Sequence, residues 1–306
     1  MPADVTGMTI VLVGPGRAGR AFARSWTSAG GSIVLAARDV ASARAFARGL
    51  ERADVLALGG RPTLAADIVI LAVGDDSIAP LAEKLSRRVA CRFAFHFSGA
   101  LASSELASLS AGGAKLASLH PLRAFSGSPE DRWDGAFVAV EGEETAARTA
   151  MRLCRRIGAR PHRLSAADKP RYHAAATLAA GGSASLLSCA TRLWTEAGLS
   201  EDEGRAALAG LAAGAVAAVE RLPFDQALTG PVARRDVETV RLHRDALASR
   251  PDLTELYALL ARETLRRTPG RGREEEILSL FSTGEGETRG SGPAGAKNSD
   301  DRPRKD

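Results

Sequence analysis

The segment Gly14–Gly19, with the sequence GPGRAG, restricts what this chain can fold into more than any other part of it. It matches the spacing GxGxxG and lies between a β-branched, apolar run at 9–13 and a helical pattern at 20–29. A second strand pattern, 32–37, ends about 20 residues further on. A lone GxGxxG is a weak signal in a chain with 31 glycines, but this order of elements is that of a dinucleotide-binding βαβ unit. The alternative is an ordinary glycine-rich turn between a strand and a helix.

The residues of the motif have separate roles in such a unit. Gly14 permits the tight turn, Gly16 lets the backbone approach a pyrophosphate, and Gly19 lets the helix pack closely against the strand. The backbone N–H groups at the helix start, including those of Arg17 and Ala18, have no partners within the helix and can bind the anion. These five residues are therefore predicted to bind the cofactor.

Short apolar runs alternate with helical patterns through the first half of the chain. The predicted strands are 9–13, 32–37, 54–58, 67–73, 92–97, 115–119 and 136–140, and the predicted helices are 20–29, 41–52, 77–87, 101–110 and 145–157. The run DIVILAV at 67–73 is apolar enough to be buried on both faces. This alternation predicts a parallel sheet with right-handed crossovers, and so an α/β Rossmann-type domain at residues 8–164.

The pattern changes near residues 164–166. Four long helical patterns follow, at 167–197, 201–221, 233–249 and 252–267, with glycine and proline between them and no strand pattern. We expect an all-α C-terminal domain at 165–281, ending in a short helix at 274–281. The remaining segment, 282–306, is expected to be disordered, because a stretch with no Val, Ile, Leu, Met or aromatic residue cannot bury enough apolar surface to fold.

The end of the second predicted strand decides between NAD and NADP. NAD sites usually place an acidic residue there for the ribose 2′-hydroxyl, whereas NADP sites have a small residue and an arginine for the 2′-phosphate. Here Ala37 is followed by Arg38, so NADP(H) is the predicted cofactor and NAD the alternative. Asp39 keeps that alternative open, because a shift of the strand end by one residue would make it the acid of an NAD site.

Two loops are expected to flank the nicotinamide, because open α/β sheets bind ligands at the carboxyl ends of their strands. Val73 and Gly74 stand at the end of the fourth predicted strand, and Ser98 and Gly99 follow the fifth. The acidic pair at 75–76 has two interpretations, a part in the site or N-caps for the helix predicted at 77–87. The second interpretation is favoured.

Three further motifs appear in order along the chain: HPLRAF at 120–125, DKPRYHAAA at 168–176 and LTGPVARRD at 228–236. Together with GxGxxG they resemble the Rossmann-like oxidoreductases that carry the C-terminal domain of unknown function 2520. The resemblance implies similarity to deazaflavin-dependent NADP oxidoreductases, pyrroline-carboxylate reductases and β-hydroxyacid dehydrogenases, whose helical domain caps the cofactor, often through dimerisation. One departure is Gly181, followed by Gly182, where the family usually has asparagine.

Lys169, His173 and His120 are the candidates for catalysis. Lys169 and His173 are four residues apart on a predicted helix and so share one face, while His120 follows a predicted strand. Reduction of a C=O or C=N bond needs a proton donor beside the acceptor atom while hydride arrives from the nicotinamide. A partly desolvated lysine can serve as donor and a histidine can relay the proton. The alternatives are a solvated helix face for the first two residues and a turn-capping role for His120.

Arginine, histidine and cysteine elsewhere in the chain give weaker signals. Arg123 and Arg234 are candidates for a bidentate contact with a substrate carboxylate, and His96, inside an apolar run, is interpreted as a core histidine. The five histidines show no ligand spacing with cysteines or acidic residues, so no metal site is predicted. Three isolated cysteines without a CxxC pair are typical of reduced core thiols in a cytosolic protein.

Charge and hydropathy restrict the partners. The net charge of +5 suits an enzyme that binds a polyanionic dinucleotide, and the arginines are scattered rather than clustered. No apolar run approaches the ~20 residues that cross a bilayer, and no signal segment is recognised. We therefore expect a cytoplasmic protein with a small-molecule substrate, without nucleic-acid or membrane partners, that forms homodimers through its alanine-rich helix 201–221.

These inferences lead to one predicted function, hydride transfer between NADP(H) and a small carbonyl compound, hydroxy acid or imine. The first alternative is a dinucleotide-binding sensor or interaction module without turnover, which the departure at Gly181 favours. The second is a basic protein associated with nucleic acid.

Overall fold

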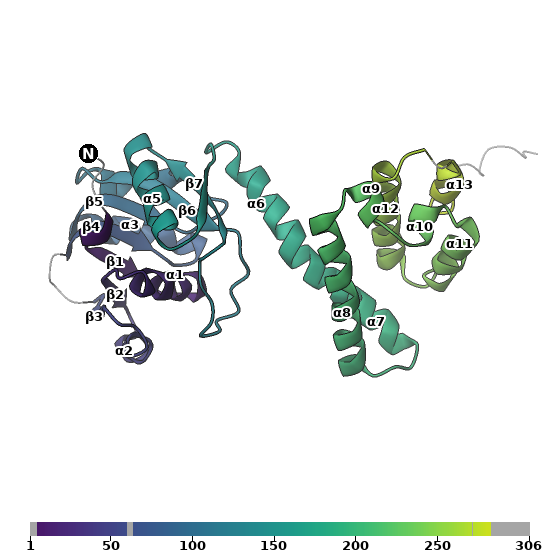
Figure 1. Ribbon diagram of the computed structural model, residues 1–306, viewed down its shortest axis with the longest axis horizontal. Helices are drawn as coiled ribbons and strands as arrows, with labels where there is room; N and C mark the ends of the chain where they lie inside the picture. Colours follow the sequence, from purple (N-terminus) through teal and green to yellow (C-terminus); the bar gives the residue numbers. More distant parts are fainter. Residues whose placement is uncertain (1–4, 60–63, 271, 283–306) are drawn as a thin grey trace, which may run out of the picture. The chain divides into compact units, whose positions relative to one another are not determined.

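The computed structural model describes residues 5–59, 64–270 and 272–282. Internal contacts divide the chain into two units, Met1–Ala184, which contains the sheet, and Ser185–Asp306, which is helical (Figure 1). The segment 165–184 was assigned to the helical domain from the sequence. It groups with the first unit, where side chains of Lys169 and Tyr172 hydrogen-bond to residues that follow or belong to strands. Apart from Ser282, the segment predicted to be disordered lies outside the described residues.

The first unit is built on one eight-stranded sheet with the strand order β3-β2-β1-β4-β5-β6-β7-β8. The sheet is parallel, as predicted, except between β6 and β7, which are antiparallel. The chain between these two strands contains no helix to carry it back across the sheet, so it returns as an antiparallel neighbour. The strands are β1 (Ile10–Val13), β2 (Ile33–Ala37), β3 (Ala53–Ala57), β4 (Leu64–Leu71), β5 (Val89–His96), β6 (Lys115–Pro121), β7 (Phe137–Gly142) and β8 (Arg160–Arg163).

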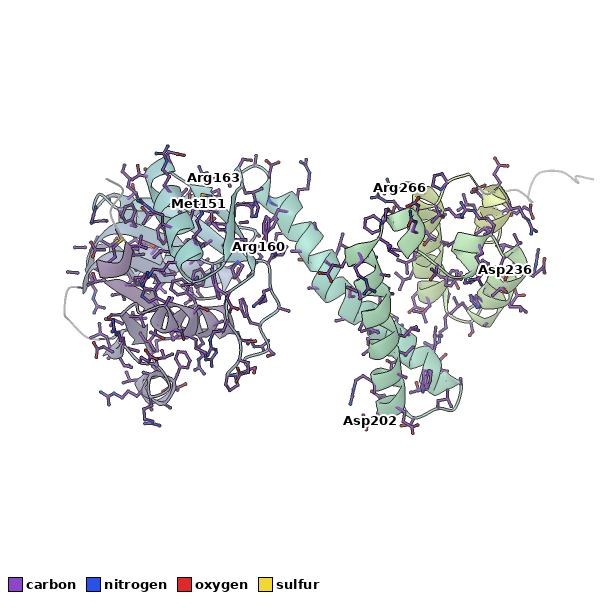
Figure 2. The ribbon with its side chains drawn as sticks, viewed as in Figure 1. Met151, Arg160, Arg163, Asp202, Asp236 and Arg266 are labelled. Carbon is purple, nitrogen blue, oxygen red and sulfur yellow. The ribbon has the colours of Figure 1, made fainter. Side chains whose placement is uncertain are left out.

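Strand β8 was not predicted. Its sequence, RPHR, has no apolar run, and it lies at the edge of the sheet, bonded to β7 alone through backbone groups. Arg160 and Arg163 are exposed there (Figure 2). An edge strand with charged side chains needs no apolar alternation, so hydropathy gave no signal for it.

Helices cover both faces of the sheet (Figure 1). Along β1, Ile10 and Leu12 contact the layer that contains α1 and α5, while Val11 and Val13 contact the layer that contains α3. This alternation buries the strand on both sides, as parallel sheets require. The helical segments are η1 (Val5–Gly7), α1 (Arg17–Ser28), α2 (Val40–Ala47), η2 (Asp75–Ser77), α3 (Ile78–Ser86), η3 (Ser103–Leu106), α4 (Ala107–Ser110), α5 (Glu144–Arg156), α6 (Lys169–Thr177) and the π-helical turn η4 (Leu178–Gly182).

The second unit is helical, as predicted. Its helices are α7 (Ser183–Glu196, from Ser185 onward), α8 (Glu201–Arg221), α9 (Phe224–Ala227), α10 (Pro231–Arg234), α11 (Val237–Ala246), α12 (Pro251–Arg267) and α13 (Glu274–Ser279). The helix predicted at 233–249 is interrupted at Arg235, which has the left-handed backbone angle φ of 57°. Asp236 then caps α11 by accepting from the Thr239 N–H at 3.1 Å. The interruption lets the buried guanidinium of Arg235 reach Thr268 and Glu274.

Two helices bury almost none of their residues within the described parts of the chain. No residue of α7 is buried, and in α8 only Gly204 is.

One helical run, Lys169–Glu196, is long and apolar enough to cross a membrane, judged by length and composition alone. This run corrects the expectation from the sequence that no apolar run approaches the length that crosses a bilayer, although a single such helix is weak evidence for a membrane span.

Candidate functional site

A cavity of about 750 Å³ lies at the carboxyl ends of β3, β2, β1 and β4. Five of the predicted cofactor residues line it, and these are Gly14, Gly16, Arg38, Val73 and Gly74. Its volume is within the range of small-molecule and cofactor sites. The fit of a dinucleotide is judged from the residues that form the cavity.

The glycine motif forms a turn that larger residues could not form. Gly14 has a φ of +70°, and a Cβ atom there would lie 2.3 Å from Val73 Cγ1. A Cβ atom on Gly19 would lie 2.8 Å from the Cβ of Ala72, so this glycine lets α1 approach β4. Gly16 is the N-cap of α1 and makes no side-chain cap, which leaves the first N–H groups of the helix without a capping partner. The roles predicted for Gly14 and Gly19 therefore have a direct steric basis.

Arg17 and Ala18 open α1 beside this turn. Arg17 is exposed and does not line the cavity, so its backbone rather than its side chain is the predicted contact. The carbonyl of Ala18 accepts a hydrogen bond from Trp133 Nε1 at 3.1 Å, which ties the helix to the core.

The tip of β2 has the arrangement that favours NADP. The strand ends at Ala37, and Arg38 follows it into the cavity. Asp39 caps α2, since its carboxylate accepts from the Ser42 N–H at 2.9 Å. Asp39 was the residue that left NAD as the alternative cofactor, and its carboxylate already accepts this hydrogen bond.

The acidic pair after β4 does not cap α3, which corrects the interpretation favoured from the sequence. Asp75 and Asp76 lie inside the short turn η2, and neither η2 nor α3 has a side-chain cap. Instead, the carboxylate of Asp75 accepts from the Ser98 hydroxyl at 2.8 Å. This bond joins the loop after β4 to the loop after β5.

A second cavity, of about 610 Å³, lies at the end of β6. His120 and Tyr172 line it and form a hydrogen bond of 2.8 Å between Nδ1 and the hydroxyl. His173 also lines it, and its ring stands nearly perpendicular to that of His120 with 5.4 Å between the centroids. The structure thus brings together two predicted catalytic residues and adds a tyrosine that the sequence analysis did not select.

Gly99 lies directly beneath the two imidazoles. A Cβ atom on this residue would lie 2.4 Å from His173 Nδ1 and 2.8 Å from His120 Nε2. The two ring nitrogens therefore converge on one point of the backbone, which only glycine permits. The Nδ1 atom of His173 is buried and has no hydrogen-bond partner among the described residues.

Burial changes the acidity of this cluster. The pKa of His120 is lowered to about 4, chiefly by desolvation and to a smaller extent by the neighbouring His173 and Lys169, while Asp75 acts in the opposite direction. Desolvation also raises the pKa of Tyr172 to about 12. At neutral pH the His120 ring is therefore uncharged and the tyrosine keeps its proton.

Lys169 lies below this cluster and lines neither cavity. The side chain is buried, and its ammonium donates to the Ser98 carbonyl at 3.0 Å and to the Ser118 hydroxyl at 2.8 Å. That hydroxyl donates in turn to Glu141 at 3.0 Å. Desolvation lowers the pKa of Lys169 to about 8, while Glu141 and Asp75 act in the opposite direction.

The remaining candidates have separate places. His96 is a buried core histidine, as predicted: its Nδ1 accepts from the Ser98 N–H at 3.1 Å, and its Nε2 lies 3.0 Å from the Ala102 carbonyl. Arg123 lines the second cavity and donates to the Arg132 carbonyl at 2.9 Å, whereas Arg234 belongs to the second unit. In the parts of the chain that the structure describes, no group of three or more metal-ligating side chains is found.

The sequence analysis did not select several residues of the two cavities, nor two polar residues of the hydrogen-bond network around Lys169. Tyr172 stands within the motif at 168–176, three residues after Lys169, so the helical spacing of that motif was the available signal. Lys84 and Arg88, which line the first cavity, are four residues apart at the end of the helix predicted at 77–87. Ser118 and Glu141 gave no signal, because only the pairing of β6 with β7 places them opposite each other.

Two segments of the chain match known protein families. Residues 9–90 match the family model described as NADP oxidoreductase, coenzyme F420-dependent, and residues 136–264 match the domain of unknown function DUF2520. A comparison with curated proteins gave no match.

Two solved structures extend the similarity over most of the chain. Protein TM1727 from Thermotoga maritima is 23% identical, with a TM-score of 0.67, and the match covers 88% of this chain and 98% of that one. A reductive aminase from Aspergillus terreus, solved with NADPH and ethyl levulinate, is 16% identical, with a TM-score of 0.60, over 90% of this chain and 99% of that one. At these identities the likeness establishes the fold. The chain thus has a Rossmann fold, an N-terminal segment that matches the NADP oxidoreductase, coenzyme F420-dependent, model and a C-terminal segment that matches DUF2520.

Proposed function

We propose that this protein is a cytoplasmic, NADP(H)-dependent oxidoreductase that transfers hydride to or from the carbon of a small carbonyl compound, hydroxy acid or imine. The observation that carries the proposal is the arrangement of two cavities in the first unit, one of dinucleotide size and one lined by His120, Tyr172 and His173. The bond between Asp75 and Ser98 joins the loops that separate them.

The residues of the first cavity fit the parts of the cofactor. The Gly14–Gly19 turn and the start of α1 would hold the pyrophosphate, and Arg38 would hold the 2′-phosphate. Val73 and Gly74, with the loop at Ser98 and Gly99, would lie beside the nicotinamide. When bound, NADP(H) supplies or accepts the hydride at C4 of its nicotinamide ring.

Tyr172 and His120 are suited to move the matching proton. For each hydride added to a C=O or C=N carbon, one proton must reach the oxygen or nitrogen. The hydroxyl of Tyr172 is protonated at neutral pH and is hydrogen-bonded to the uncharged His120 ring, so it can give its proton to the substrate heteroatom in the second cavity as hydride arrives. The tyrosinate that remains would then take up a proton from solvent before the next turnover. His173 lines the same cavity, so its ring can contact the substrate.

We assign Lys169 a positioning role in place of the proton transfer for which the sequence suggested it. The ammonium of Lys169 donates to the hydroxyl of Ser118 and to the carbonyl of Ser98. Holding that carbonyl fixes the adjacent Gly99, against which the rings of His120 and His173 pack. The charge of Lys169 therefore acts on the reaction through this loop.

The second cavity indicates a small, mainly apolar substrate. Apart from the three aromatic and imidazole side chains, its walls are chiefly small apolar residues of α6 and η4, with Arg123 as its one guanidinium. A carboxylate on the substrate would find its partner in Arg123. Gly181 also lines the cavity, so the amide that the family usually has at this position would face the substrate.

The proposal includes a homodimer formed through α8. Leu211 is 73% exposed and Val216 is 64% exposed, on a helix whose central part consists of alanine, glycine, leucine and valine. A helix that is apolar all round is normally covered, and its small side chains permit close packing against a second copy of the same helix. The mass in solution, measured by light scattering, tests this, and a monomeric mass would contradict it.

The function is tested by titrating the purified protein with NADPH and NADH while following cofactor fluorescence, and then by screening ketones, aldehydes, imines and hydroxy acids for turnover. We expect NADPH to bind more tightly than NADH and Arg38→Ala to weaken NADPH selectively. Arg44→Ala is the matched control, because Arg44 is exposed on α2 and does not line the cavity. Absence of binding by either dinucleotide up to about a millimolar, well above typical KM values, would refute the function. Tight NADPH binding with no turnover of any substrate would favour the non-catalytic sensor.

A further inference from the structure

The first cavity contains more positive charge than the sequence motif accounts for. Besides Arg38, it is lined by Lys84 in the last turn of α3 and by Arg88 just beyond that helix. No ion pair joins any of these three side chains to a carboxylate among the described residues. Of the two acidic residues in the lining, Asp39 is occupied as the cap of α2.

Two hydrogen bonds, one of them from the side chain of Arg88, place this residue next to the tip of β2. Its Nη1 donates to the carbonyl of Leu58 at 3.5 Å, and the N–H of Leu58 donates to the carbonyl of Ala37 at 3.0 Å. Ala37 immediately precedes Arg38, so Arg88 and Arg38 approach the same end of the cavity from different elements. Lys84 is four residues before Arg88, one helical turn away on the same side of the segment.

This end of the cavity also has an apolar wall. Leu58, Leu81 and Leu85 line it, from the end of β3 and from α3. Apolar walls with a few charged groups at one side suit an aromatic base that carries a charged substituent nearby. The lining contains no basic side chain besides Arg38, Lys84 and Arg88.

We propose that Lys84 and Arg88, acting with Arg38, form the recognition site for the 2′-phosphate of NADP(H), with the adenine between Leu58 and Leu81. This inference rests on the proposed function and adds to it two specificity-determining residues, both from α3 and its C-terminal end. Three cations that form no ion pair among the described residues are more than enough to neutralise a phosphomonoester, whose charge is close to −2 at neutral pH. NADH lacks that phosphate, so it would leave the three cations without a counter-ion.

The test compares Lys84→Ala, Arg88→Gln and the control Arg87→Ala. Arg88→Gln removes the charge but keeps an N–H donor for the Leu58 carbonyl, so the edge of β3 stays in place. Arg87 is the exposed C-cap residue of α3 and does not line the cavity. Dissociation constants are measured by calorimetry for NADPH and NADH, and for the fragments 2′,5′-ADP and 5′-ADP.

We expect Lys84→Ala and Arg88→Gln each to weaken NADPH and 2′,5′-ADP by roughly 10- to 100-fold, the loss of one hydrogen bond to a charged group. NADH and 5′-ADP should bind as before, and Arg87→Ala should change none of the four constants. Equal losses for both dinucleotides, or no loss for either, would overturn the assignment of these residues while leaving the oxidoreductase function intact. A wild-type protein that binds neither dinucleotide, or that prefers NADH, would overturn the proposed function and this inference with it.

Discussion

Lys169 and Glu141 are two buried, oppositely charged residues that interact through the hydroxyl of Ser118 and not directly. The hydroxyl accepts from the ammonium at 2.8 Å and donates to the carboxylate at 3.0 Å. Glu141 also accepts from the N–H and the hydroxyl of Ser103, at 2.7 and 2.9 Å. This network connects β6, β7 and α6 beneath the loop at Ser98 that carries Gly99.

Replacing Glu141 with glutamine should destabilise the first unit and lower the pKa of Lys169 further. An uncompensated buried ammonium is costly, so we expect a loss of about 1–3 kcal/mol at pH 7. The loss should be smaller near pH 9.5, because the lysine is then largely neutral in the folded protein. Urea denaturation at both pH values measures it. Glu144→Gln, on the exposed start of α5, is the control, and equal losses at both pH values would show that charge is not the cause.

Tyr172→Phe should lower kcat by about 10²- to 10⁴-fold, the usual contribution of a positioned acid or base, and leave the affinity for NADPH unchanged. The change removes one hydroxyl next to His120 and keeps the ring. Steady-state kinetics with a substrate found in the screen, together with fluorescence titration, separate the two effects. Tyr257→Phe is a matched control, because this tyrosine makes the same contact, 2.9 Å to Nδ1 of His243, in the second unit. A kcat close to that of the wild type would remove Tyr172 from the proton path.

Gly99→Ala should abolish activity while the protein still folds. The new methyl group would meet both His173 and His120 at under 3 Å, so both rings must move, at a cost of about 1–3 kcal/mol in stability. Gly49→Ala is the control, since its Cβ atom would have no contact closer than 3.6 Å. Activity and thermal denaturation are measured on both variants. An active Gly99→Ala enzyme would mean that the placement of the two imidazoles is not needed for turnover.

Acidification should destabilise the first unit between about pH 6.5 and pH 4. The folded pKa values of His96 and His120 are about 4, below the ordinary value of 6.5, so the unfolded chain binds more protons in this range and stability falls as the pH falls. Below about pH 4 both states bind these protons, and the two histidines cause no further loss. His120→Gln should flatten the pH dependence measured by urea denaturation. His162→Gln, at an exposed position on β8, should leave the slope as it is in the wild type.

Arg235 should be the residue on which the second unit depends most. Its buried guanidinium donates to the Ala233 carbonyl and the Thr268 hydroxyl, both at 2.8 Å, to the Thr268 carbonyl, and to Glu274 at 2.8 Å. Arg235→Met should cost about 3–5 kcal/mol because it removes the buried donor that serves the carbonyls of Ala233 and Thr268 and the hydroxyl of Thr268. Arg235→Lys should recover little, since an ammonium cannot reproduce the fork. Arg234→Met is the neighbouring control, and equal denaturation midpoints for the two Met variants would contradict this role.

Local patterns in the sequence determined the fold class and one end of the cofactor site. Apolar runs alternating with helical periodicity predicted the α/β domain, because strands that are buried on both faces of a parallel sheet consist of consecutive apolar residues. Gly14 and Gly19 could be predicted for the same reason, since a positive φ and a close helix–strand approach each require glycine locally. Strand β8 could not, because an edge strand held by backbone hydrogen bonds leaves no hydropathy pattern.

Only the tertiary structure decided which polar side chains work together. His120 and His173 were selected separately, but their convergence over Gly99 depends on where α6 crosses the end of β6. Lys169 shared a helix face with His173 in sequence, yet its long side chain reaches past the cluster to Ser98 and Ser118. Such contacts join residues far apart in the chain, and their geometry is set by packing. Residue type and spacing in the sequence show which side chains can carry a proton or a charge. Their burial and their hydrogen-bond partners, which only the fold determines, decide which of them do so.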